Sequence, residues 1–265
     1  MNKTVPVDVS VVGDCAHAIE GILLKWKSKG IRVNIDNWME QIEKWRSKKS
    51  LNYKKASDVI KPQYAVERLY ELTKDKDTYI TTEVGQHQMW AAQYYKFDKP
   101  NRWINSGGLG TMGFGLPAAM GAKLAFPKSE VVCVTGEASI LMCIQELATC
   151  LQYMLPIKIV NLNNRYMGMV RQWQEFFYEG RYAMSYMEAL PDFCKLSSSF
   201  GHVGIQIDKP SELRTKLNEA MKIKNRLVFI DVITDQEENV YPMIKSGKAH
   251  NEMHLSPTNE DTELA

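Results

Sequence analysis

A strand-helix-strand pattern between residues 131 and 162 constrains the fold of this chain more than any other feature. Short apolar runs at 131–135 and 157–162 flank a helical stretch at 140–153. Two parallel strands joined in this way bring their carboxyl ends to the same edge of a sheet, which is where open α/β folds bind ligands. The same alternation continues from residue 62 to residue 233, which predicts an α/β fold with a parallel sheet and helices on both faces.

The other predicted elements share this alternation of apolar strands with helices. Strands are expected at 78–83, 203–207 and 227–233, and helices at 63–72, 86–95, 115–126, 169–177, 191–200 and 211–221. A Gly-rich loop at 106–113 precedes the third of these helices.

The chain divides into four predicted parts. In residues 1–33, an apolar run at 7–12 predicts a strand and is followed by a helical pattern, and we interpret this unit as the tail of a second α/β domain. Residues 34–61 form a polar linker with one helix at 38–46, residues 62–234 form the main domain, and residues 235–265 form a C-terminal arm.

Composition excludes several classes of function. The formal net charge is +2, which predicts binding neither to nucleic acid nor to a membrane surface. No apolar run approaches the roughly 18 residues of a spanning helix. Five cysteines without a CxxC pattern indicate reduced core residues rather than disulfides or a zinc site.

Polar side chains follow both strands of the central unit. Glu137 comes just after the first strand, and Asn164 just after the second. A carboxylate and an amide oxygen at one sheet edge suit a hard cation that holds a diphosphate. Taken singly, Glu137 is equally explained as a helix cap and Asn164 as a turn residue.

Three further segments have functional and structural interpretations. His87, in 85–88, begins a helix, whose amides could bind phosphate oxygens. The Gly-rich loop has the outline of a dinucleotide fingerprint, which often arises by chance, and its glycines also allow a cofactor ring to approach the backbone. The Met-rich and aromatic stretch 167–174 fits core packing or a helix at the ligand edge.

These segments together resemble a known family. Gly136-Glu137-Ala138 with Asn163-Asn164 is similar to the GDG…NN motif of thiamine-diphosphate enzymes, although Glu replaces Asp and Ala replaces the second Gly. The order and spacing of the other matching segments resemble the acetolactate synthase large subunit over essentially the whole chain. These segments are 85–93, 106–117, 145–149, 168–177, 190–193 and 240–244.

The resemblance implies a set of site residues. Metal ligands to Mg²⁺ would be the Glu137 and Asn164 side chains and the Tyr166 carbonyl. Thiamine diphosphate would contact a second set, namely Gln86, His87, Gly110, Met112, Ala138, Ser139, Gly168 and Met169. Val170 and Trp173 would shape the substrate pocket. The activating glutamate lies on a different domain in this family, so no catalytic residue is assigned in this chain.

The implied reaction condenses two pyruvates, or pyruvate with 2-ketobutyrate, with loss of CO₂, in branched-chain amino-acid biosynthesis. The family also implies FAD in the complete enzyme, a homodimer or larger assembly, and a regulatory small subunit. We expect a C-terminal piece that is inactive alone, in a cytoplasmic, bacterial-type protein, with organellar targeting left open because the N-terminus is missing. Alternatives are another thiamine-diphosphate carboligase or oxidase, or a non-catalytic module with this fold.

Overall fold

The computed structural model describes residues 5–255, and the chain divides into two compact units between Lys49 and Ser50. The first unit contains helices α1 (Cys15–Lys29) and α2 (Asp36–Ser47). Asp14 caps α1 by accepting hydrogen bonds from the amides of Ala16 and His17, and Gly30 ends this helix in the left-handed conformation. Most side chains of this unit are exposed.

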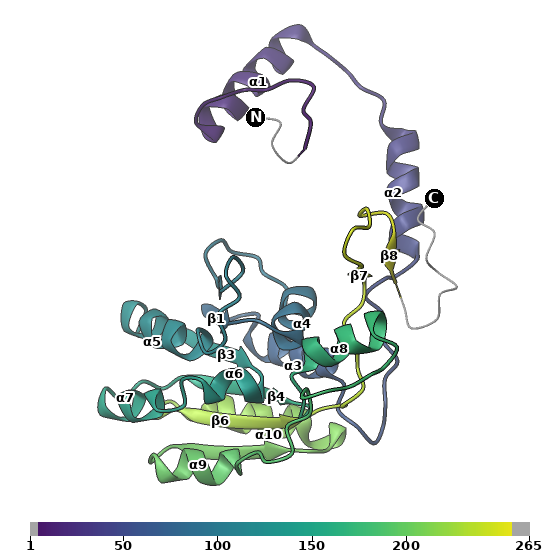
Figure 1. The fold of residues 1–265 in the computed structure, drawn as a ribbon. Helices are drawn as coiled ribbons and strands as arrows, with labels where there is room; N and C mark the ends of the chain where they lie inside the picture. The colour runs from purple at the N-terminus through teal and green to yellow at the C-terminus, as the bar shows by residue number, and fades with distance from the viewer. Residues whose placement is uncertain (1–4, 256–265) are drawn as a thin grey trace. The chain divides into compact units, whose positions relative to one another are not determined.

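The second unit alternates strands with helices (Figure 1). Its strands are β1 (Thr78–Thr82), β2 (Trp103–Asn105), β3 (Glu130–Thr135), β4 (Lys158–Asn163), β5 (Val203–Ile207), β6 (Val228–Ile233), β7 (Met243–Ile244) and β8 (Met253–His254). Its helices are α3 (Pro62–Thr73), α4 (Gln86–Tyr94), α5 (Gly115–Ala125), α6 (Glu137–Leu141), α7 (Glu146–Gln152), α8 (Gly168–Phe177), α9 (Phe193–Ser199) and α10 (Pro210–Lys222).

Six of these strands form one parallel sheet in the order β2-β1-β3-β4-β6-β5. The chain runs from β1 to β2 on one side, and then returns to place β3 on the other side of β1. This reversal is a topological switch point, where the loops after two adjacent strands separate and leave room for a ligand. The predicted parallel sheet of an α/β fold is therefore confirmed.

Strand residues alternate between two hydrophobic cores. Val132 and Val134 of β3 pack with residues of α3, α4 and α10 on one face, whereas Val131 and Cys133 pack with residues of α5, α7 and α9 on the other. Because both faces are covered, the strands have almost no polar face, which explains the continuous apolar runs in the sequence. The two cores hold the carboxyl ends of β1, β3 and β4 in place.

Some local predictions were wrong. The apolar run 7–12 forms no strand in the described residues, since the first unit offers no neighbouring strand for its backbone to pair with. The stretch 140–153 is not one helix, because turns interrupt it between α6 and α7. The short edge strand β2 and the pair β7 and β8 were not predicted. No helix within residues 5–255 is long and apolar enough to span a membrane.

Candidate functional site

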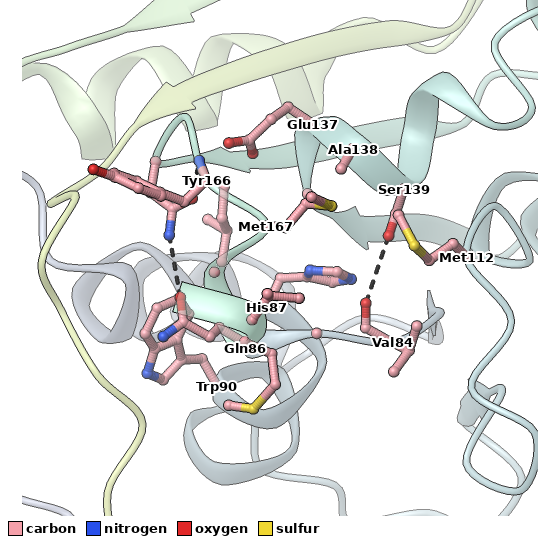
Figure 2. Close-up of a pocket in the computed structure, with 17 residues that line it drawn as sticks. Val84, Gln86, His87, Trp90, Met112, Glu137, Ala138, Ser139, Tyr166 and Met167 are labelled. Atoms are coloured by element: carbon pink, nitrogen blue, oxygen red, sulfur yellow. Dashed lines mark hydrogen bonds between the residues drawn. The ribbon is translucent and has the colours of Figure 1, made fainter. Parts of the chain in front are cut away.

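A cavity of about 260 Å³ opens at the carboxyl edge of the sheet, beside the switch point. Its lining comes from the end of β4 and from the segments that follow β1, β3 and β4, together with one residue of the Gly-rich loop (Figure 2). The lining residues are Val84, Gly85, Gln86, His87, Trp90, Met112, Gly136, Glu137, Ala138, Ser139, Leu162, Asn164, Tyr166, Met167, Gly168, Met169 and Val170.

Glu137 is the buried carboxylate of this cavity. Its side chain is 1% exposed, and its Oε1 atom has no hydrogen-bond partner. Burial raises the pKa of this carboxyl group to about 8, although backbone amides, including those of Tyr166 and Arg165, oppose the rise. An unpartnered buried carboxylate oxygen is costly unless a ligand satisfies it, so this atom points to a bound cation or a hydrogen-bond donor.

Asn164 lines the same cavity, directly after β4, and is held from two sides. Its Oδ1 accepts a hydrogen bond of 3.1 Å from the amide of Tyr166, and its Nδ2 donates one of 3.1 Å to Gln86 Oε1. These contacts fix which end of the amide carries the oxygen. Asn163, by contrast, faces the interior, where its Nδ2 donates to Asp231 at 3.1 Å. The two asparagines therefore have different roles.

Buried amides extend from Asn164 away from the cavity. Gln86 Nε2 donates to Gln172 Oε1 at 2.9 Å and to the Glu238 carbonyl at 3.1 Å. Gln172 in turn accepts from the Val240 amide at 2.9 Å and donates to the Val240 carbonyl at 3.1 Å. The cavity is thus connected through α4 and α8 to the segment after β6.

Two glycines permit the close packing around these side chains. A Cβ atom at Gly168 would lie 2.1 Å from Gln86 Oε1, and one at Gly85 would lie 2.9 Å from the His87 ring. Gly85 also has φ of 138°, which side chains rarely tolerate. Gly85 precedes α4, and Gly168 is the first residue of α8. The first turn of each helix carries no acidic residue and no side-chain cap. Their free amides suit an anion.

His87 lies against the cavity as a neutral, buried ring. It is 7% exposed, and burial lowers its pKa to about 3. Its Nε2 atom lies 3.5 Å from Glu83 Oε1 and makes no hydrogen bond. The ring also lies close to Gly136, where a Cβ would come within 2.9 Å of Nδ1. The imidazole therefore packs between the loops after β1 and β3.

Most residues singled out in the sequence lie in this cavity, but two do not line it. Gly110 adopts φ of 70° and packs near Val84, which does line the cavity. Trp173 is 49% exposed and contacts Phe177 edge-on at 5.6 Å between ring centroids. Six lining residues are not among the predicted site residues, namely Val84, Gly85, Trp90, Gly136, Leu162 and Met167. Their proximity to the predicted residues in sequence was the available signal.

The donor set is poor in charged ligands. Within residues 5–255, no three His, Cys, Asp or Glu side chains come together in a way that could hold a metal ion. A cation here would bind one carboxylate, one amide oxygen and a backbone carbonyl, and would need further oxygens from its ligand. Such a donor set fits a hard cation of the Mg²⁺ type that also coordinates phosphate oxygens.

Comparisons with known proteins agree with this geometry. Residues 83–232 match the family model described as thiamine pyrophosphate enzyme, C-terminal TPP binding domain. The matched range contains every residue that lines the cavity.

Acetolactate synthase large subunits are similar to nearly the whole chain. The isozyme 3 large subunit of Escherichia coli (strain K12) is 54% identical over 263 residues, which cover 97% of this chain and 46% of that protein. The large subunit of Haemophilus influenzae is 51% identical over 264 residues, with 99% and 46% covered, and that of Porphyra purpurea is 44% identical over 248 residues, with 92% and 41% covered.

The chain thus spans about half the length of the curated relatives it matches, 46% in the first two. Its cavity lies wholly inside the segment that the family model covers. The chain belongs to the thiamine pyrophosphate enzymes and is similar to the C-terminal part of their acetolactate synthase large subunits.

Proposed function

We propose that this chain supplies the diphosphate-binding part of the active site of an acetolactate synthase. The reaction condenses two pyruvates, or pyruvate with 2-ketobutyrate, with release of CO₂. The observation that carries this proposal is the buried Glu137, whose Oε1 atom has no partner at a cavity lined by the helix starts of α4 and α8. The similarity to acetolactate synthases supports it over the entire range of those lining residues.

Glu137, the Asn164 side chain and the Tyr166 carbonyl would hold Mg²⁺. Glu137 would supply the single negative charge, and the unpartnered Oε1 would become a ligand atom. The Tyr166 amide already orients Asn164 by donating to its Oδ1 at 3.1 Å, so this amide oxygen is preorganised before any metal arrives.

Thiamine diphosphate would supply the carbanion chemistry of the reaction. The chain binds and orients it. The diphosphate would lie near Gln86, His87, Ala138, Ser139, Gly168 and Met169, where uncapped helix amides favour its charge. Met112 would support the thiamine rings, and Gly110 would approach them through its backbone. Val170 and Trp173, which are 45% and 49% exposed, would face the second 2-keto acid.

The complete enzyme would also bind FAD and form a homodimer or larger assembly, with a regulatory small subunit as a further partner. These proposals follow from membership in the family. Acetolactate synthesis in such an enzyme belongs to branched-chain amino-acid biosynthesis, which is cytoplasmic in bacteria.

Titration calorimetry of the 265-residue chain tests the core of this proposal. We expect saturable binding of thiamine diphosphate in the presence of Mg²⁺, because metal and helix amides together neutralise the diphosphate. Removal of Mg²⁺ with EDTA should abolish it, and thiamine without phosphate should bind far more weakly. Equal affinity with and without Mg²⁺, or no binding of thiamine diphosphate at all, would contradict the proposal.

A further inference from the structure

Glu83 is a second buried carboxylate near the cavity, and the proposed function does not use it. It follows β1 directly, its exposed fraction is 1%, and it is not among the lining residues. A buried carboxylate without a cation is costly, so its retention at this position calls for a physical role.

The carboxylate joins the ends of two strands to the start of a helix. Its Oε1 accepts a hydrogen bond from Thr135 Oγ1, at the end of β3. Its Oε2 lies so close to Gly115 that a Cβ atom at this position would overlap with it. The backbone of Gly115 also forms a hydrogen bond with the Glu83 carboxylate. Thr81 Oγ1 donates to the Gly115 carbonyl at 2.8 Å. Gly115, the first residue of α5, is therefore hydrogen bonded both to Thr81 of β1 and to Glu83, which follows β1.

The same carboxylate reaches two residues that line the cavity. Its Oε1 lies 3.5 Å from His87 Nε2, and the Ser139 side chain also hydrogen bonds to it. Ser139 Oγ additionally lies 3.5 Å from the Val84 carbonyl, which Figure 2 marks with a dashed line. Glu83 therefore contacts two of the segments that line the cavity, those after β1 and β3, and does not line the cavity itself.

The groups around Glu83 are uncharged. The titratable groups that face it are His87 on α4, Cys133 on β3 and Cys143 after α6. Burial raises the pKa of Glu83 to about 7, and hydrogen bonds from Thr135, Ser139 and Gly115 oppose this rise. No lysine or arginine of the described chain contributes to the shift.

We propose that Glu83 is a positioning residue, which holds His87, Ser139 and the end of β3 in the arrangement that binds the diphosphate while making no contact with the ligand itself. This inference rests on the proposed function. Hydrogen bonds from Thr135 and Ser139 to Glu83 join the segment after β3 to the end of β1, beside a His87 ring whose Nε2 makes no hydrogen bond.

Two variants of the full chain test this role. Glu83→Gln keeps the size of the side chain but removes its charge, and Thr135→Val keeps the size but removes the hydroxyl donor. We expect each to raise the Kd for thiamine diphosphate with saturating Mg²⁺ about tenfold, the scale of losing a hydrogen bond to a charged group. The double variant should lose no more than Glu83→Gln alone, because Thr135→Val removes only a contact that Glu83→Gln already weakens. Thr135→Ser, which restores the hydroxyl, should bind like the unmodified chain.

Thermal unfolding separates positioning from simple structural support. Burial raises the pKa of Glu83 in the folded chain from the ordinary 4.5 to about 7. The folded chain therefore loses stability as the pH rises through this range, and the loss is complete above it. Glu83→Gln lacks this loss. Its Tm relative to the unmodified chain should therefore rise between about pH 5 and about pH 8.5, while its affinity for the cofactor falls.

Glu219→Gln is the matched control, because Glu219 is exposed on α10 far along the chain from these contacts. It should leave both Kd and Tm within experimental error.

An unchanged Kd in Glu83→Gln, or additive losses in the double variant, would overturn the inference. Should Glu83→Gln fail to fold, Thr135→Val with the Thr135→Ser rescue decides. Absence of binding by the unmodified chain would instead overturn the proposed function, and the inference with it.

Discussion

At the residue scale, the departure of this chain from the usual metal motif is concentrated at Glu137. Glutamate is one methylene longer than the aspartate of the motif, and here it begins α6 with one carboxylate oxygen that has no partner. Backbone amides of Arg165 and Tyr166 interact with the same carboxylate, so it reaches toward the loop that carries the other proposed ligands. The extra length is accommodated within the cavity rather than directed to solvent.

Replacement of Glu137 by Gln tests its assignment as a metal ligand. The amide keeps the shape but lacks the negative charge, so we expect the Mg²⁺-dependent part of thiamine diphosphate affinity to fall at least about tenfold. Calorimetry with and without EDTA measures this difference, with Glu219→Gln as the control for loss of one negative charge. If the Mg²⁺ dependence persists unchanged in Glu137→Gln, Glu137 is not a ligand.

At the scale of elements, α8 is fixed in place by polar contacts rather than by an apolar face. Gln172 is fully buried at 0% exposure, and Arg171 is buried at 3%. Arg171 donates to the Glu237 carbonyl at 2.7 Å and to Asn239 Oδ1 at 2.8 Å. The helix start at the cavity is therefore oriented by the segment 237–240.

Gln172→Leu should weaken this attachment strongly. The substitution leaves the Val240 amide and carbonyl and the Gln86 side chain without their partner, and unpaired buried groups cost about 1–3 kcal/mol each. We expect the free energy of unfolding to fall by about 2–4 kcal/mol, measured by urea denaturation. Gln152→Leu, at an exposed position on α7, should change it by less than about 0.5 kcal/mol. A similar change in both variants would show that the network does not anchor α8.

The central strands β3, β4 and β6 could be predicted because they are buried on both faces and rich in apolar residues, whereas the short edge strand β2 gave no such signal. The approximate position of the cavity followed from Glu137 and Asn164, which come directly after adjacent parallel strands. The amide network could not be predicted from the sequence, because Gln86, Gln172 and Val240 are distant from one another in the chain and glutamines usually lie on the surface. The predicted strand at 7–12 does not form, because strand-like composition alone does not supply a neighbouring strand with which the backbone can pair.

At the scale of the whole molecule, the chain covers about half of an acetolactate synthase large subunit, 46% in the E. coli relative. Glu137 is the only carboxylate that lines the described cavity, and the proposed function assigns it to the metal. The described residues thus offer binding groups for the cofactor but no second carboxylate to activate it.

We therefore expect the 265-residue chain to bind thiamine diphosphate without forming acetolactate. A colorimetric assay for acetolactate with pyruvate, Mg²⁺, FAD and thiamine diphosphate measures this, and a complete acetolactate synthase under the same conditions serves as the positive control. Acetolactate formation above the background of a Glu137→Gln sample would contradict the expectation.

The contacts of the amide network also determine where this domain can be shortened. The family match ends at residue 232, whereas Gln86 and Gln172 obtain their partners from Glu238 and Val240. A protein trimmed to the matched range would keep every residue that lines the cavity and lose the backbone that holds two of its helices. Domain boundaries taken from sequence profiles alone would thus be too short here, and a usable C-terminal limit lies beyond Val240.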